Sequence, residues 1–356
     1  MNGKESMMDQ RQRRIWLIGQ LLKEYQEYRD TDEADLPVPR NDEERRLLLR
    51  ALQNVRLPAP VSERFLRVQD EYLGAELAQR TITDANDIPP VETVTTESVT
   101  TESATPETVA PASAGTTSST QPIQNTQSPQ SPQATQSPQS PQSHATLAIW
   151  QGDITTLRCD AIVNAANSGL TGCYAPNHHC IDNAIHSAAG VQLRLACARI
   201  MEQQGHPEPV GRAKITPGFN LPARYVLHTV GPMIPSGDPT PDEQEQLADC
   251  YRSCLRLAAD HGLETVAFCA ISTGEFRFPA ELAARIAVRT VRDFLARQLA
   301  QQEAAQPQPT STIGTAPTPT ASTANHRPAN TIRKVIFDVF SDRDRQIYER
   351  VFADHD

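Results

Sequence analysis

Two polar, low-complexity segments limit how much of this 356-residue chain can fold. Between residues 88 and 145, VTTES occurs at Val94 and Val99, and QSPQSPQ occurs at Gln127 and Gln136. A second stretch, rich in Pro, Thr and Gln, covers residues 301–330. Because neither stretch carries enough apolar side chains to bury a core, we expect a disordered linker and a disordered insert.

Charge and cysteine content narrow the class of protein. The net charge of −10 argues against nucleic acid or an anionic membrane as the main partner. No run of about 18 apolar residues predicts a membrane span, and the polar start MNGKESMMDQRQRR does not resemble a signal peptide. All 7 cysteines lie from Cys159 onward. The expectation is a cytoplasmic protein with reduced thiols.

Residues 1–87 are expected to form a helical N-terminal extension. Apolar residues such as Ile15 and Leu21 recur at helical spacing, and Asn41 and Ser62 can cap two further helices. So small a region is a poor candidate for an independent domain. We expect it to brace the domain that follows, although a partner-docking module would show the same pattern.

Residues 146–356, apart from the insert at 301–330, alternate strand and helix signals. This alternation predicts an α/β sandwich with a mixed, mostly buried sheet. The expected strands are Leu147–Trp150, Ala161–Asn164, Ala213–Thr216, Tyr225–Thr229, Val266–Ile271 and Lys334–Phe340. The expected helices are Asp182–Ala189, Gln192–Gln204, Asp242–Asp260, Pro279–Leu299 and Asp342–Phe352. The last strand must reach back across the insert to join the sheet.

Three loops at expected strand ends carry polar or small residues suited to a ligand. Gln151–Thr155 contains a carboxylate, Asp153, which can accept from an exocyclic amine or simply cap a turn. Asn164–Gly169 offers two amides and a glycine. Ile271–Pro279 precedes a helix, where backbone N–H groups can face a phosphate. Ligands in open α/β sheets bind at such carboxyl ends.

A cluster of metal-binding residue types follows the second loop. Cys173, His178 and Cys180 lie within eight residues, directly before a helix that contains Asp182. Two thiols and an imidazole suit zinc, and a missing fourth ligand leaves a position for water or substrate. The alternative is two buried thiols beside a surface histidine, and His179 could replace His178. Asp182 could act in catalysis or serve only as a first-turn helix residue.

These motifs together resemble the macrodomain family, an ADP-ribose-binding three-layer α/β/α sandwich. The matching segments are QGDIT, DAIVNAANSGL, CIDNAIHSAAG, HTVGP and ISTGEFRFP, across about residues 147–297 plus the final strand. GCYAPNHHCIDN more narrowly resembles the zinc-dependent branch, described as protein-ADP-ribosyl hydrolases. RALQNVRLPAP and FLRVQDEYL resemble the helical extension of that branch, whereas the linker and the insert depart from its compact form.

The resemblance implies a role for each matching residue. Asp153 and Ile154 would bind adenine, and Asn164 and Asn167 the distal ribose. Cys173, His178 and Cys180 would hold one zinc ion, and Asp182, with Asn167, would act in hydrolysis. The residues expected to wrap the diphosphate are Ser272, Thr273, Gly274, Glu275 and Phe276.

The implied function is zinc-assisted removal of mono-ADP-ribose from modified protein side chains. Zinc would either activate the attacking water or polarise a ribose hydroxyl. One alternative is a reader that binds ADP-ribose without cleaving it, and another is deacetylation of O-acetyl-ADP-ribose. The implied partners are ADP-ribose and mono-ADP-ribosylated proteins, in a system with a sirtuin-type ADP-ribosyl transferase.

Overall fold

The computed structural model describes residues 8–29, 38–96, 144–305 and 332–354. A seven-stranded sheet forms its centre, with the strand order β2-β3-β9-β8-β5-β7-β6. The strands are β2 (Glu92–Val94), β3 (Ala145–Gln151), β5 (Ala161–Ala165), β6 (Ala213–Pro217), β7 (Tyr225–Thr229), β8 (Thr265–Phe268) and β9 (Lys334–Val339). β2 and β6 pair antiparallel with their neighbours, and the five strands between them are parallel. The sheet is therefore mixed, as the sequence predicts.

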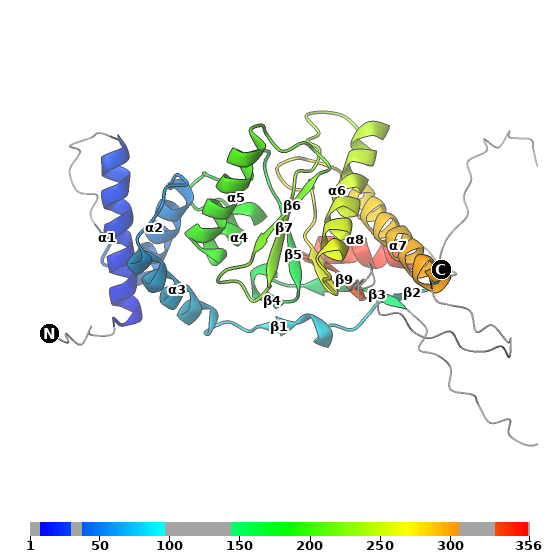
Figure 1. The fold of residues 1–356 in the computed structure, drawn as a ribbon, viewed down its shortest axis with the longest axis horizontal. Helices are drawn as coiled ribbons and strands as arrows, with labels where there is room; N and C mark the ends of the chain where they lie inside the picture. The colour runs from blue at the N-terminus through cyan, green and yellow to red at the C-terminus, as the bar shows by residue number, and fades with distance from the viewer. Residues whose placement is uncertain (1–7, 30–37, 97–143, 306–331, 355–356) are drawn as a thin grey trace, which may run out of the picture.

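Helices cover both faces of the sheet (Figure 1). One layer contains α4 (Ile181–Ala189) and α5 (Val191–Gln204), and the other contains α6 (Pro241–Asp260), α7 (Ala280–Ala305) and α8 (Asp342–Ala353). Because both faces are covered, strands such as β5 and β9 are nearly continuous runs of buried residues. The expected three-layer α/β/α sandwich is confirmed.

Local sequence signals set several helix starts. Thr240 and Glu243 form a capping box at the start of α6, where Pro241 occupies the first turn. Ser341 and Asp344 form a second capping box at α8. At α4 the N-cap is Cys180, whose sulfur accepts from the backbone N–H of Asn183. A residue of the expected metal cluster therefore also begins a helix.

The N-terminal region folds as three helices packed on the α4/α5 layer. They are α1 (Gln10–Arg29), α2 (Asp42–Val55) and α3 (Glu63–Leu77). Their shared core, which includes Leu17, Leu49 and Phe65, also takes in Val191 of α5. The backbone N–H of Val191 donates to Gln69 of α3 at 3.0 Å. The helices therefore pack on the domain that follows.

Two boundaries differ from the sequence-based expectation. β2 lies in the stretch assigned to the linker from residue 88; Val94 is fully buried and the Glu92 carboxylate binds Arg292 of α7. A pattern of three residues is too short to predict a strand. Its pairing partner, β3, is also separated from it by the linker. Helix α7 also continues to Ala305, past the expected insert start at 301. The rest of the expected linker and insert, residues 97–143 and 306–331, lies outside the described residues.

Short elements join the helical extension to the sandwich. β1 (Thr83–Asp84) pairs in parallel with β4 (Leu157–Arg158), and two 3₁₀ turns, Ala85–Asp87 and Ile154–Thr156, lie beside them. The part of the extension after α3 therefore contains no α-helix. Within the described ranges, no helix is long and apolar enough to cross a membrane.

Candidate active site

A cavity of about 730 Å³ opens at the carboxyl ends of the parallel strands. Segments that follow β3, β5, β8 and β9 all contribute to its wall, as expected for a ligand site in an open α/β sheet. Among the residues predicted from sequence, those that line it are Asp153, Ile154, Asn167, Cys173, His178, Cys180, Asp182, Ser272, Thr273, Gly274, Glu275 and Phe276. The fold therefore gathers residues more than 120 positions apart into one site.

Asn164 lies behind this wall instead of in it. Its side chain is fully buried, and its Nδ2 donates to Asp182 Oδ1 at 2.7 Å. The same Nδ2 lies 3.2 Å from His228 Nδ1. In place of the expected contact with a ribose, Asn164 orients the carboxylate of Asp182.

Asp182 combines burial with access to the cavity. Only 4% of its surface is exposed, yet it lines the cavity. Burial raises the pKa of Asp182 to about 6, against the lowering effect of the hydrogen bond from Asn164. Asn167 Nδ2 lies 3.4 Å from Asp182 Oδ2, and so the two expected catalytic residues are adjacent.

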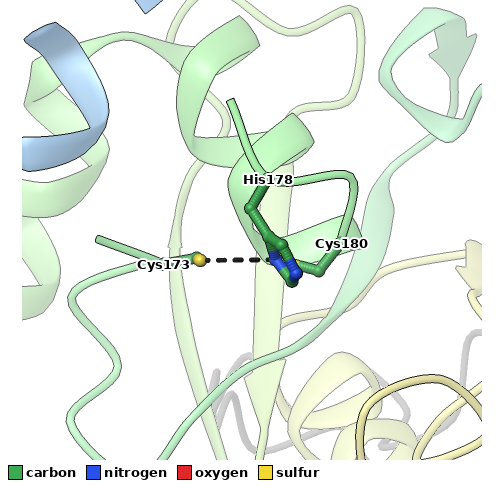
Figure 2. Close-up of side chains that lie close together, drawn as sticks. All are labelled: Cys173, His178 and Cys180. Carbon is green, nitrogen blue, oxygen red and sulfur yellow. Dashed lines mark hydrogen bonds between the residues drawn. The ribbon is translucent and has the colours of Figure 1, made fainter. Parts of the chain in front are cut away.

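Cys173, His178 and Cys180 all line the cavity, and their side chains lie close together (Figure 2). Their ligand atoms all lie within 4.8 Å of one another, and Cys173 Sγ is 3.6 Å from His178 Nδ1. A tetrahedral zinc ion with ordinary Zn–S and Zn–N bonds separates sulfur from nitrogen by about 3.6 Å. The donor set and its spacing therefore fit zinc. His179 is exposed, which leaves His178 as the imidazole of the cluster.

His178 is also held from its other ring nitrogen. Its Nε2 lies 3.4 Å from Glu275 Oε1, so Nδ1 faces Cys173 while Nε2 faces a carboxylate. Metal-binding histidines usually have such a partner on the second nitrogen, which fixes the ring orientation. The contact also joins the cysteine loop to the loop that follows β8.

A second group of metal-ligand types, His186, Cys197 and His228, lies fully inside the protein behind Asp182. Since Asn164 donates to His228 Nδ1, the proton of this ring sits on Nε2 and is donated to Thr216 Oγ1 at 3.0 Å. Burial lowers the pKa of His228 to about 3, which keeps the ring neutral. These contacts give His228 a structural role behind Asp182.

Backbone strain shapes the loop after β8. Ser272 has a φ of 65° and is buried at 6% exposure. Gly231 passes so close that a Cβ atom there would lie 2.0 Å from Ser272 Oγ. A glycine at 231 is therefore needed for residues 272–276 to curve around the cavity.

Asp153 lines the cavity from the segment that follows β3. Its Oδ1 accepts from the backbone N–H and the hydroxyl of Thr155, and its Oδ2 pairs with Arg80, just after α3. Burial alone would raise the pKa of Asp153, but the hydrogen bonds from Thr155 and Arg80 outweigh it and lower the pKa. The carboxylate is ionised and remains an acceptor.

Sequence reasoning assigned no role to several charged or aromatic residues that line the cavity, among them Arg50, Asp338, Phe340 and Asp344. Phe340 is 83% exposed, and burial raises the pKa of Asp338 well above its usual range. The last three lie in or just after the strand expected at Lys334–Phe340, which was the available signal. Arg50 comes from α2 and begins the segment RALQNVRLPAP, so the resemblance marked this segment but not its contact with the cavity.

Comparisons with known proteins agree with this geometry. The sequence model of the Macro domain family matches residues 163–287. The protein-ADP-ribose hydrolase of Treponema medium is 40% identical over 346 residues, 97% of this chain and 100% of that protein. The protein-ADP-ribose hydrolase of Staphylococcus aureus strain MSSA476 is 37% identical over 348 residues, 98% of each. A macro domain-containing protein of Ralstonia nicotianae is 53% identical over 148 residues, 42% of this chain and 80% of that protein.

Proposed function

Because this chain belongs to the macrodomain family, we propose that it is a hydrolase that removes mono-ADP-ribose from modified protein side chains. One observation carries the proposal beyond binding. The cavity that would hold ADP-ribose also contains a buried carboxylate, Asp182, beside Asn167 and a cluster of two thiols and an imidazole. A protein that only binds ADP-ribose needs neither the carboxylate nor the cluster. The names of the two hydrolase relatives support the same activity.

The substrate would lie along the cavity with its adenine at Asp153 and Ile154. The ionised Asp153 carboxylate accepts from the exocyclic amine, and the exposed ring of Phe340 offers a face on which the base can stack. Residues 272–276 surround the diphosphate, and Asn167 hydrogen-bonds the distal ribose. Contacts so far from the reacting bond hold the sugar in place and lower the entropic part of the barrier.

Hydrolysis breaks the bond between the distal ribose C1″ and the protein side chain, or an ester formed with that sugar. Asp182 accepts a proton from the attacking water, whose oxygen forms the new bond. The released side chain takes up a proton, so the products are ADP-ribose and the unmodified protein. Asn164 and Asn167 hold the two carboxylate oxygens of Asp182 during this step.

Cys173, His178 and Cys180 would hold one zinc ion at the reacting end of the cavity. Zinc, when bound, supplies a Lewis acid that polarises a nearby oxygen and lowers the pKa of water. Glu275 orients the His178 ring for this role.

The test is release of ADP-ribose from a mono-ADP-ribosylated protein by the full chain, compared with Asp182→Asn. Loss of a general base lowers kcat by about 10²–10⁴-fold. Asp153→Asn is the matched change at the other end of the cavity, and we expect it to raise KM more than it lowers kcat.

Calorimetric titration with ADP-ribose separates the competing functions. If the wild-type chain binds ADP-ribose but releases none from any linkage type, the protein is a reader and the hydrolase proposal fails. Faster turnover of O-acetyl-ADP-ribose than of the modified protein would favour the deacetylase.

A further inference from the structure

We propose that Arg50, on helix α2 of the N-terminal extension, is a positioning residue for the metal loop, defined as residues 173–180. The extension would then be part of the site and not only a brace. The inference rests on the proposed function, because that proposal assigns a zinc ion to Cys173, His178 and Cys180.

Arg50 reaches from the extension into the wall of the cavity. Its Nε and Nη2 both donate to Asn183 Oδ1, at 3.1 and 2.8 Å. Its Nη2 also donates to the backbone carbonyl of His178 at 3.1 Å. The planar guanidinium presents its donors in a fixed arrangement, so these contacts define both distance and direction.

Asn183 carries the effect of Arg50 to the rest of the loop. It is fully buried, its backbone N–H donates to Cys180 Sγ at 3.4 Å, and its Nδ2 donates to the carbonyl of Ala175 at 3.0 Å. Through Asn183 and the His178 carbonyl, Arg50 therefore acts on two of the three ligand residues.

The next turn of α2 holds the middle of the same loop. Asn54 lies four residues after Arg50, on the same face of the helix. Its Oδ1 accepts from the backbone N–H of Asn177 at 3.0 Å, and its Nδ2 donates to Ser187 of α4 at 3.0 Å. Asn177 has a φ of 53°, in the left-handed region that asparagine adopts more readily than most residues. The extension thus fixes the loop at a residue with left-handed backbone geometry.

A loop of this kind needs outside support if it is to bind metal tightly. The segment between Cys173 and Cys180 contains no helix or strand in the structure, so ordering its backbone costs free energy that binding must offset. Groups that orient metal ligands from outside typically contribute about 10–100-fold to metal affinity. We expect Arg50 to contribute within this range.

Zinc affinity of the purified full chain tests the inference. The metal-free wild type, Arg50→Ala and Arg50→Lys are titrated with zinc in competition with a chromophoric chelator. We expect Arg50→Ala to weaken zinc binding about 10–100-fold, and Arg50→Lys to recover part of the loss because one ammonium can still reach one acceptor. Arg46→Ala is the matched control, since Arg46 lies one turn earlier on α2 and pairs with Glu43 and Glu76 instead of the loop.

Melting of the metal-free chains separates positioning from general damage. The inference predicts reduced zinc affinity in Arg50→Lys at an unchanged melting temperature. It is overturned if Arg50→Ala or Arg50→Lys folds and binds zinc within twofold of wild type. If the wild-type chain binds no zinc, the metal has no part in the proposed function, and this inference is overturned as well. Wild type that binds zinc and releases ADP-ribose, with no effect of Arg50, would refute only the inference.

Discussion

Arg194 offers a severe test of how the extension is attached to the sandwich. This arginine of α5 is 5% exposed, and its Nη1 donates to the carbonyls of Gln53, Asn54 and Arg56 at 2.8, 2.8 and 2.5 Å. Its Nε donates to the carbonyl of Thr171 at 2.6 Å. Helix α2 has no basic residue in its last turn. Arg194 therefore satisfies carbonyls that the helix end leaves open and places a positive charge at the negative end of its dipole.

The expected cost of Arg194→Met follows from these four carbonyls. Nη1 has two N–H groups and Nε has one, so three N–H groups serve these carbonyls, and a net contribution of about 1 kcal/mol for each gives a loss of about 3 kcal/mol in the free energy of unfolding. Water can reach part of the helix end once the arginine is replaced, so we expect a measured loss of about 2–3 kcal/mol. Methionine is long and flexible enough to fill the space, which limits the loss from packing.

Urea denaturation followed by tryptophan fluorescence provides the assay. The two tryptophans divide the molecule, because Trp16 lies in α1 and Trp150 lies in β3. In a Trp150→Phe background, Trp16 reports on the extension alone. Arg199→Met, an exposed arginine on the same helix, should change the free energy by less than about 0.5 kcal/mol. A loss below about 1 kcal/mol for Arg194→Met would refute the reasoning.

Three further outcomes can be checked. The pKa of His228 is about 3 in the folded chain against 6.5 for an ordinary histidine, so the unfolded chain binds the extra proton and the free energy of unfolding falls as pH drops below 6.5. His228→Asn should remove about 1.4 kcal/mol per pH unit of that fall, as measured by urea denaturation at several pH values. An unchanged pH slope would contradict this expectation. Gly231→Ala should weaken ADP-ribose binding in calorimetry, because the added Cβ would lie 2.0 Å from Ser272 Oγ and overpacking costs about 1–3 kcal/mol. If the variant binds ADP-ribose as tightly as wild type, the loop adjusts to the added atom and this expectation is wrong. Cys173→Ala should abolish zinc binding and turnover but retain ADP-ribose affinity, whereas equal loss of turnover and affinity would mean that the metal only holds the loop.

Hydrophobic runs and caps predict most of the sandwich from sequence. The strand expected at Tyr225–Thr229 has those bounds in the structure, and β9 and α8 differ from expectation only at their ends. Such patterns depend only on neighbouring residues in the sequence, so they predict a helix or strand even when its packing partners are unknown. β1 and β2 are two and three residues long, and only their pairing makes them strands.

Motif spacing likewise predicts the loops that form the cavity, because carboxyl ends of parallel strands meet at one edge. What the spacing does not reveal is the direction of each side chain. Asn164 and Asn167 belong to one motif, yet only Asn167 lines the cavity. Arg50 was missed for a related reason. Its contacts with Asn183 span 133 residues and depend on how the extension docks.

The position of β9 has a consequence for how the chain is made. This strand is the penultimate element, yet it pairs with β3 on one side and β8 on the other. During synthesis, therefore, the middle of the sheet stays open until residues 334–339 have left the ribosome. A message truncated upstream of Lys334 would yield a product with two unpaired strand edges, and such edges invite aggregation. A premature stop between α7 and β9 should therefore leave the sheet without its central strand.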